Sequence, residues 1–524
     1  MSVSMTEPRE PEAPAGSMGR KQVLEAMSGL MMGMFVAILA STVVANALPR
    51  IVSELGGSQA SYTWVVTTEL LAMTATVPLW GKLSDLYNKK LLIQLSLGLF
   101  VVGSLVAGFA GNIELLIASR VAQGIGAGGL TALAQVIMAA IVSPRELGKY
   151  SGIFGAVFAV GTIAGPLIGG VMVDTSWLGW RWCFFLGVPF AVAAILLLQR
   201  TLKLPTIRRD VKVDYLGAFL IMAGVSTLLV WSSLAGHQFA WGSWWTVGLV
   251  TGGVVVLALA VYVESKVAEP ILPLGLFRNR TVSLTTLASF LVGVAMFGGT
   301  VFLSQYFQLS LGKSPTVAGL LSLPMIFGIL VSSTVSGQLI SRTGKWKSHL
   351  LLGATLMTVG LALLGTLDSK TNLVVLGAYM VVLGVGVGML MQNLVLVSQN
   401  DVDAHDLGTA TSTLSFFRSL GGSIGVSALG AVLANRVTAQ ITEELGPLPG
   451  GGEGGAVPNI ATLPEPVASV VRDAYGEATS ELFLISAPIA LLVIVAVAFL
   501  KHKPLKTQSG NERLAEETAA DAVV

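Results

Sequence analysis

The sequence contains very little charge. Only 11% of its 524 residues are Asp, Glu, Lys or Arg, whereas 53% are hydrophobic. Soluble domains carry about 25% charged residues, so this chain lacks the polar material for a surface that faces water. Apolar runs of about twenty residues recur along it, which is the length that crosses a bilayer core of about 30 Å. Lipid offers no hydrogen bonds to the backbone, so we predict an all-α polytopic membrane protein.

Other absences exclude whole classes of site. Cys183 is the only cysteine, which excludes an intrachain disulfide and a zinc site built of thiolates. The net charge is +2, and no basic patch indicates a nucleic-acid partner. No phosphate-binding loop of the form G-x4-G-K followed by Ser or Thr is present, nor is H-E-x-x-H or G-x-S-x-G. We therefore predict no enzyme activity, no metal and no cofactor.

The apolar runs predict about fourteen membrane spans. They lie at about 23–50, 61–80, 91–110, 114–140, 149–173, 182–200, 214–235, 244–264, 281–309, 316–340, 349–367, 373–400, 409–435 and 479–500. Most of the 31 lysines and arginines lie in the two tails or in the loops that join even-numbered spans to odd-numbered ones. Such loops are cytoplasmic by the positive-inside rule, so we predict that both termini are cytoplasmic.

The glycines indicate an internal repeat at an offset of about 260 residues. The segment QGIGAGG around Gly124 matches LGVGVGM around Gly384, and three fifth-span glycines recur in the thirteenth span. The equated spans share one orientation, so the repeat predicts two parallel six-helix bundles. The expected parts are a disordered cytoplasmic tail (1–20), an N-terminal bundle (21–201), an inserted helical pair with linkers (202–280), a C-terminal bundle (281–500) with a long outer loop (437–478), and a cytoplasmic tail (501–524).

The fifth span reads GIFGAVFAVGTIAGPLIGG. Small residues four positions apart let helix backbones touch, and a proline inside a helix removes one hydrogen bond. Plain close packing is one interpretation of this pattern. The spacing also resembles the fifth-helix signature of antiporters in the major facilitator superfamily. The residues that carry this antiporter signature are Gly152, Gly161, Gly165, Pro166, Gly169 and Gly170.

The loop GKLSDLYNKK resembles the superfamily's loop after the second helix. Asn88 stands where the family usually has glycine, and it tolerates a left-handed backbone nearly as well. The resemblance implies a cytoplasmic gate that closes the inner side in the outward-facing state; a solvated basic loop is the alternative. The expected gate residues are Gly81, Lys82, Asp85, Lys89 and Lys90.

Further segments extend the resemblance over nearly the whole chain. WRWCFFLGVP, VDYLGA, AEPILPLGLFRNRT and LSFFRSLGG are similar to the fourteen-span drug/proton antiporters. This similarity implies proton-driven export of small amphipathic substrates, cationic ones among them, from a bacterial cytoplasmic membrane. The family commonly has L-D-x-T in its first span, whereas this chain has Leu39-Ala40-Ser41-Thr42, so the usual acid is missing.

One acidic residue lies deep in a predicted span. Glu69 is about eight residues, or ~12 Å, into the second span at 1.5 Å per residue. An acid inside a membrane indicates a functional site, and Arg120 in the fourth span should lie at similar depth. We hypothesise that Glu69 replaces the missing aspartate as proton carrier, with Arg120 as the cation that favours its ionised form. A purely structural pair, or a wall of the substrate cavity, is the alternative.

Polar and methionine side chains on other spans are candidates for a substrate cavity, since flexible and amphipathic groups suit bulky amphipathic molecules. Each of them can instead face a neighbouring helix. Two other functions stay open: a transporter with a single cargo, such as a self-made antibiotic or a lipid, and a membrane sensor that transports nothing. The sequence does not indicate an oligomeric state. The candidate cavity residues are Thr42, Asn46, Met73, Gln305, Tyr306, Gln308, Gln392, Asn393 and Arg418.

Overall fold

A computed structural model describes residues 20–521, except 57–58, 176–178, 203, 205–213, 236–238, 268, 314, 369 and 446–463. The predicted disorder of the N-terminal tail therefore lies outside the described residues. Within them the chain is helical and forms no β-strand. The predicted all-α fold class is confirmed.

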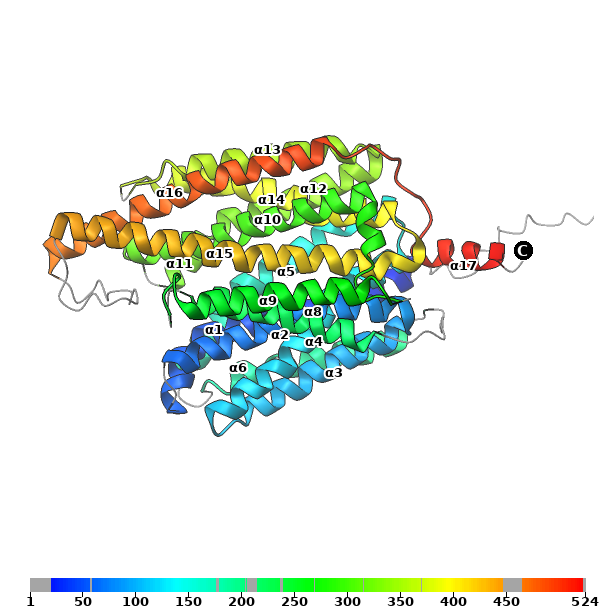
Figure 1. Cartoon of the computed structure of the whole chain (residues 1–524), viewed down its shortest axis with the longest axis horizontal. Helices are drawn as coiled ribbons and strands as arrows, with labels where there is room; N and C mark the ends of the chain where they lie inside the picture. The colour runs from blue at the N-terminus through cyan, green and yellow to red at the C-terminus, as the bar shows by residue number, and fades with distance from the viewer. Residues whose placement is uncertain are drawn as a thin grey trace, which may run out of the picture.

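Seven helices form the first half of the chain and two more form the inserted pair. The first half comprises α1 (Arg20–Glu54), α2 (Gln59–Leu86), α3 (Lys89–Gly108), α4 (Ile113–Ile141), α5 (Pro144–Asp174), α6 (Trp182–Phe185) and α7 (Gly187–Thr201). The pair comprises α8 (Tyr215–Leu234) and α9 (Trp244–Glu264). The helices run lengthwise through the molecule, side by side (Figure 1).

The second half begins with the short helix η1 (Leu274–Arg278). It continues with α10 (Arg280–Gln305), the π turn η2 (Tyr306–Ser310), α11 (Pro315–Leu321), α12 (Leu323–Thr343), α13 (Trp346–Leu364), α14 (Leu373–Asp401), η3 (Ala404–Asp406), α15 (Leu407–Leu445), α16 (Glu465–Ala498) and α17 (Gly510–Asp521). We call the end of the bundle that holds α17 the α17 end; α3, α5, α13 and α15 all start there (Figure 1).

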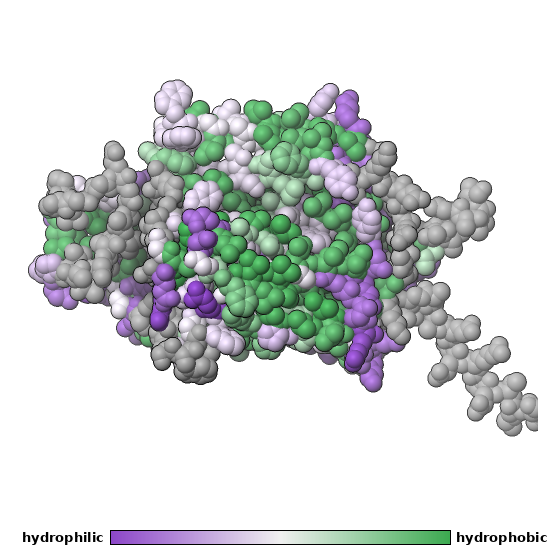
Figure 2. Space-filling view, turned by 90° about the horizontal axis from the view of Figure 1, so that it is seen from below, coloured by the Kyte–Doolittle hydropathy of each residue, from purple (hydrophilic) through white to green (hydrophobic). Residues whose placement is uncertain are grey.

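The surface of this bundle is that of a multi-pass membrane protein. Twelve helices in the described part are long and apolar enough to cross a membrane. The helices α2 and α5, of 28 and 31 residues, are not among the twelve and include side chains outside the described part, so the number fourteen stays a prediction. On the face shown in Figure 2, apolar residues cover the middle and hydrophilic residues gather toward the two ends. Soluble monomers rarely expose so much contiguous apolar surface.

The two halves repeat the same arrangement of neighbours. In the first half α4 packs on α2 and α3, while α1 packs on α5 and α7. In the second half α14 packs on α12 and α13, while α10 packs on α15 and α16. These four contacts of one half thus have counterparts at the equivalent spans of the other, as the predicted parallel repeat requires.

The two bundles meet along two seams. At the first seam α2 packs on α15, and at the second α5 packs on α12, which is the equivalent pair. Glycines allow the backbones to touch in both places. A Cβ on Gly81 would lie 2.8 Å from the carbonyl oxygen of Gly408, and a Cβ on Gly148 would lie 2.3 Å from that of Gly337. Both contacts are at the α17 end, so the bundles are in contact there.

The inserted pair lies against the first seam. The helix α8 packs on α9, on α2 and on α15, so it touches both bundles. Trp244 and Trp245 at the start of α9 are 88% and 69% exposed, and Tyr215 at the start of α8 is 76% exposed. Exposed aromatic side chains at both ends of a helical pair are typical of the two membrane–water interfaces.

The predicted outer loop 437–478 is shorter than the sequence indicates. The helix α15 continues to Leu445, and α16 already begins at Glu465. Polar pairs link the two helices there: Arg436 Nε lies 3.0 Å from Glu481 Oε2, and Gln440 Nε2 donates to Glu477 Oε2 at 2.9 Å. These charged side chains end the apolar run, although the helices themselves continue.

The C-terminal tail 501–524 also contains a helix. A Cβ on Gly510, the first residue of α17, would lie 2.6 Å from Leu407 Cδ1 and 2.9 Å from the Ala139 carbonyl oxygen. Before it, the backbone N–H of Arg145 donates to the Lys506 carbonyl at 3.2 Å. The tail therefore leaves α16 of the second half and reaches α4 and α5 of the first.

The close approach of helix backbones at glycine gives a test of the packing. A Cβ on Gly386 of α14 would lie 2.3 Å from the Met357 amide nitrogen of α13, whereas one on Gly98 of α3 would meet nothing within 4 Å. We expect Gly386→Ala to destabilise the protein by ~1–3 kcal/mol, because backbone must move to admit the methyl group. We expect Gly98→Ala to be neutral or slightly stabilising, since alanine favours helix. Thermal unfolding in detergent measures both, and equal effects would contradict this packing.

Candidate functional site

A carboxylate and a guanidinium meet in the interior of the first bundle. Glu69 of α2 is 3% exposed and Arg120 of α4 is 2% exposed. Arg120 Nη2 donates directly to Glu69 Oε2 in an ion pair. At 1.5 Å per residue Glu69 lies about 15 Å along α2 from Gln59, well inside the span. The structure thus brings together the two residues for which the sequence predicts proton coupling.

Arg120 has further acceptors besides Glu69. Its Nε donates to the Val65 carbonyl at 3.3 Å, and its Nη1 donates to Gln123 Oε1 at 3.0 Å. Gln123 in turn donates from Nε2 to Ser104 Oγ of α3 at 2.8 Å. This network holds the guanidinium in place from three helices, so Arg120 does not depend on Glu69 alone for its orientation.

Small residues bring α2 and α4 close enough for this pair. A Cβ on Gly124 would lie 2.4 Å from the Glu69 carbonyl oxygen, and one on Gly128 would lie 2.6 Å from that of Met73. The glycines of QGIGAGG therefore have a definite role in the fold. They seat α4 against the stretch of α2 that carries Glu69.

The glycines of the antiporter signature in α5 serve two different contacts. Gly161, Gly165 and Gly169 face α1: a Cβ on Gly165 would lie 2.1 Å from Thr42 Oγ1, and Thr42 donates to the Gly161 carbonyl at 3.1 Å. Gly152 instead faces α12 of the other bundle, where a Cβ would lie 2.0 Å from Thr334 Oγ1. The side-chain positions of Pro166 and Gly170 lie outside the described residues.

The predicted gate loop joins the two bundles at the α17 end. Asp85 Oδ1 accepts from the Gly408 amide at 2.8 Å, and Oδ2 accepts from the amide and the hydroxyl of Thr409, each at 2.8 Å. Both residues belong to the first turn of α15. A carboxylate at a helix N-terminus is stabilised by free N–H groups and by the helix dipole. Asp85 therefore caps a helix of the opposite bundle.

The lysines of the gate loop have other partners than Asp85. Lys82 is 5% exposed and pairs with Glu269 Oε2 at 2.7 Å, while Lys90 Nζ donates to the Gln199 carbonyl at 2.7 Å. Lys89 is partly buried at the start of α3, and its positive charge attracts the Asp85 carboxylate. The hydrogen bonds of Asp85 thus go to backbone and hydroxyl of α15, and not to these basic side chains.

Asn88 does not adopt the left-handed conformation that its position indicates. Its φ is −61°, and its side chain accepts from the Lys90 amide at 2.9 Å, so it caps the N-terminus of α3. At the equivalent turn of the second half, Gly344 ends α12 with a φ of 70°. At this turn the first half thus has an asparagine that caps the start of the next helix, whereas the second half has a glycine that ends the preceding helix.

Two of the candidate cavity residues are completely buried and bonded to the protein. Tyr306 donates from its hydroxyl to the Asp368 carbonyl at 2.6 Å. Asn393 Nδ2 donates to Ser336 Oγ at 3.1 Å and to the Met389 carbonyl at 2.8 Å. Tyr306 thus joins η2 to the loop between α13 and α14, and Asn393 joins α14 to α12. The loop between α13 and α14, which holds Asp368, has hydrogen bonds of its own. The Thr371 hydroxyl donates to the Asp368 carboxylate and so holds the pKa of Asp368 below its usual value.

The other candidate cavity residues are distributed over both bundles. Met73, Gln305, Gln308 and Gln392 are half-buried, and Gln305 Oε1 has no hydrogen-bond partner among the described residues. Thr42 belongs to the α1–α5 contact, and the Asn46 side chain lies outside the described part. Arg418 of α15 is 8% exposed and donates from Nη1 to the Met391 carbonyl at 3.3 Å. A role in binding substrate stays a prediction for these residues.

The structure adds contacts that the sequence did not indicate. Glu264 at the end of α9 accepts from the amides of Ile271 and Leu272 at 3.1 and 3.0 Å, and its neighbour Asp214 caps α8. Asp214 and Glu264 thus fix the ends of the inserted helices, and the Lys82–Glu269 pair joins the segment after α9 to α2. Long sequence separation hides such contacts, since the Lys82–Glu269 pair spans 187 residues.

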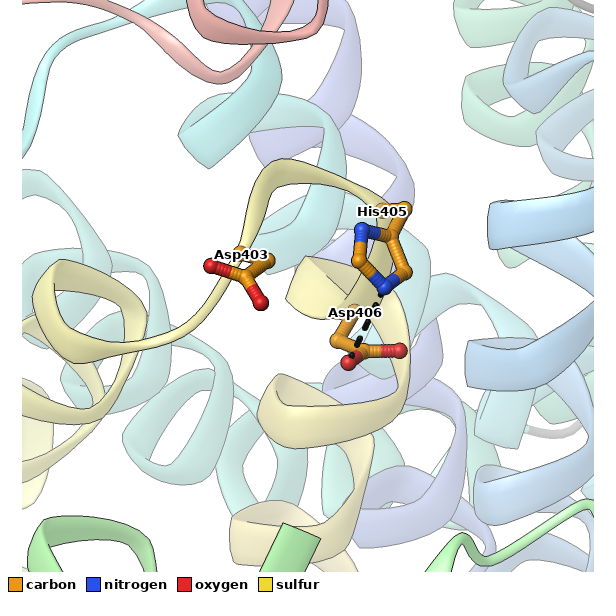
Figure 3. A group of neighbouring side chains, drawn as sticks. All are labelled: Asp403, His405 and Asp406. Atoms are coloured by element: carbon orange, nitrogen blue, oxygen red, sulfur yellow. Dashed lines mark ion pairs between the residues drawn. The ribbon is translucent and has the colours of Figure 1, made fainter. Parts of the chain in front are cut away.

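A small acidic group lies near the gate. Asp403, His405 and Asp406 place potential ligand atoms within 4.8 Å of one another, and His405 Nε2 lies 3.4 Å from Asp406 Oδ2 (Figure 3). All three side chains are open to solvent to some degree. Surface acids often gather in this way without a metal, so we assign this group no ion.

Comparisons with known proteins agree with this arrangement. Residues 30–426 match the family model described as Major Facilitator Superfamily. A Mycobacterium tuberculosis protein named as an uncharacterized MFS-type transporter is 37% identical over 91% of this chain and 69% of its own. The multidrug transporter protein MdtP of Bacillus subtilis is 35% identical over 80% of this chain and 77% of its own. A bacterial homologue of the iron transporter ferroportin, solved in the outward-facing state, aligns with a TM-score of 0.59 at 12% identity over 90% and 98% of the two chains.

The buried ion pair gives a test of its energetic coupling. We expect Arg120→Met to destabilise the protein by ~3–5 kcal/mol, because it leaves Glu69 as an uncompensated buried charge. Adding Glu69→Gln to that variant should recover much of the loss, since it removes the remaining charge. Thermal unfolding of the two single variants and the double variant measures the coupling. Strictly additive effects would show that the two groups do not interact.

Proposed function

The chain belongs to the major facilitator superfamily, and from this membership we propose that it exports drugs or antibiotics in exchange for protons, by alternating access. It is a membrane transporter and not an enzyme. Relatives named for multidrug transport support small-molecule substrates. The finer proposal concerns the driving ion, the cargo and the membrane.

The observation that carries the proposal is the buried Glu69–Arg120 pair. Ionisable groups at this depth are costly in a membrane protein and mark ion pathways. When Glu69 takes up a proton, its attraction for Arg120 ends. The guanidinium still has the Val65 carbonyl and Gln123 Oε1 as acceptors, so it stays oriented while the carboxyl group is released. A proton can therefore load and unload without collapse of the network.

Competition at Glu69 couples the proton to the cargo. A cationic group of the cargo and a proton both stabilise the same carboxylate, so the binding of one disfavours the other. The proposed cargo is a small amphipathic molecule, cationic compounds among them, which contacts half-buried residues such as Met73, Gln305 and Gln392. The proton gradient is then the energy source, and we propose no cofactor and no metal.

Alternation between the two open states requires the bundles to separate at each end in turn. The α17 end carries the Asp85 cap on α15 and the glycine contacts of both seams. We assign these contacts to the cytoplasmic gate. The positive-inside rule supports a cytoplasmic position for the α17 end and for both termini. The bacterial cytoplasmic membrane is the proposed location, and the bacterial relatives support it.

Substitution of the proton carrier tests the proposal directly. We expect Glu69→Gln to abolish protonophore-sensitive efflux of an ethidium-like dye from cells, while the protein remains folded and inserted. Gln can still accept a hydrogen bond from Arg120, but it cannot bind and release a proton. Glu114→Gln, which changes an exposed acid at the start of α4, is the matched control and should export normally. Full proton-driven export by Glu69→Gln would refute the assignment.

The gate is tested by accessibility at its seam. Ser412 is buried against Gly81, so in a Cys183→Ser background a cysteine introduced by Ser412→Cys should react slowly with a maleimide. Adding Asp85→Asn should accelerate labelling several-fold, because the amide accepts weakly from the N-terminus of α15. Glu146→Gln, which neutralises an exposed acid at the same end, should leave the rate unchanged. An unchanged rate with Asp85→Asn would exclude this carboxylate from the gate.

A further inference from the structure

Arg418 is a buried cation for which the described structure contains no acidic partner. It lies in α15, about 16 Å along the helix from Leu407 at 1.5 Å per residue, and is 8% exposed. Among the described residues its hydrogen bond runs from Nη1 to the Met391 carbonyl at 3.3 Å. Arg120, by contrast, has Glu69 and two further acceptors. A guanidinium inside a membrane protein is costly without an anion beside it.

Three buried hydroxyl groups without partners in the described part lie on α15 and on the neighbouring helix α10. Ser415 precedes Arg418 by one helical turn on the same face of α15, and its Oγ has no hydrogen-bond partner within the described part of the chain. Thr286 and Ser289 of α10 are 4% and 2% exposed, and their hydroxyls have no partner there either.

Thr286 and Ser289 lie on the face of α10 that packs on α15. A Cβ on Gly293 would lie 2.0 Å from the Arg418 carbonyl oxygen, so Gly293 faces α15 at this level. Thr286 and Ser289 precede it by seven and four residues, which is the spacing of one helix face. Buried polar groups are nearly always hydrogen-bonded, so several unmet donors on two facing helices indicate a ligand.

This donor set matches an anionic oxygen group. A guanidinium can donate two parallel hydrogen bonds to a carboxylate, and hydroxyl groups can donate to its remaining lone pairs. A cation would be repelled by Arg418. We propose, on the basis of the proposed transport function, that Arg418 binds a carboxylate-like group of the cargo, and that the cargo is a zwitterionic amphiphile. Its cationic end then competes with the proton at Glu69.

Two dyes that differ by one methyl group test this proposal. Tetramethylrhodamine carries a cationic ring system and a free carboxylate, whereas its methyl ester carries the cation alone. Binding of each dye to the purified full-length protein is measured by fluorescence anisotropy. We expect the wild type to bind the acid at least about tenfold more tightly than the ester, since hydrogen bonds to a charged group are the strong ones.

Substitutions at position 418 should remove this preference selectively. Arg418→Gln should lower the affinity for the acid to that for the ester and leave the ester affinity unchanged, while Arg418→Lys should retain part of the preference. Arg436→Gln, on the exposed end of the same helix, is the matched control. If the wild type bound the acid and the ester equally well, as Arg418→Gln should, the proposal would be overturned. The absence of any binding of the acid to the wild type would overturn it too.

Thermal unfolding without dye separates a binding role from a structural one. Removal of an uncompensated buried charge should leave the melting temperature of Arg418→Gln equal to that of the wild type or higher. A marked decrease would show that Arg418 stabilises the fold and would overturn the proposal. Failure of the proposed function gives a different result. If the acid bound in an Arg418-dependent way but no protonophore-sensitive efflux occurred, the binding site would stand and proton-driven export would be contradicted.

Discussion

The ion pair between Glu69 and Arg120 determines how the rest of the molecule can work. Two charges buried in a lipid-embedded bundle gain little stability over apolar side chains, so their presence indicates a use. The pair joins α2 to α4, and the other end of α2 carries Asp85, which caps α15 of the opposite bundle. One helix therefore bears both the carboxylate that we propose as the proton carrier and the carboxylate that caps the opposite bundle. On the proposed mechanism, a shift of α2 when Glu69 is protonated changes the Asp85 contacts directly.

The seams between the bundles make such a shift inexpensive. They are built at the α17 end from glycines whose backbones touch, with Gly81 against Gly408 and Gly148 against Gly337. Glycine has no side chain to interlock at these contacts, which favours sliding or rocking of the bundles there. The halves are not equivalent, however. Asp85 adds charge-assisted hydrogen bonds to the first seam, whereas at the second seam Arg145 donates from Nε to the Ser341 carbonyl at 3.3 Å. The first seam thus responds more strongly to a change of charge.

The sequence predicted what depends on composition, helical depth and repeat. Hydrophobic runs gave the helical membrane fold, and equal depth gave the contact of Glu69 with Arg120. It did not predict the partner of Asp85, because Gly408 is 323 residues away and a backbone amide leaves no trace in a sequence. Asn88 was expected to copy a glycine conformation, yet its side chain caps α3 instead. The ends of α15 and α16 were missed because charged side chains end an apolar run without ending a helix.

The charges of the interior constrain which cargo can be exchanged for a proton. In the described interior Glu69 and Arg120 compensate each other, which leaves Arg418 as the excess positive charge. A purely anionic cargo would compensate Arg418, and it would also favour protonation of Glu69, so cargo and proton would travel together. A purely cationic cargo would compete with the proton but would add to the repulsion around Arg418. A zwitterion satisfies both groups: its anionic end neutralises Arg418 and its cationic end replaces the proton at Glu69. On the proposed mechanism, exchange in opposite directions follows from these electrostatic interactions.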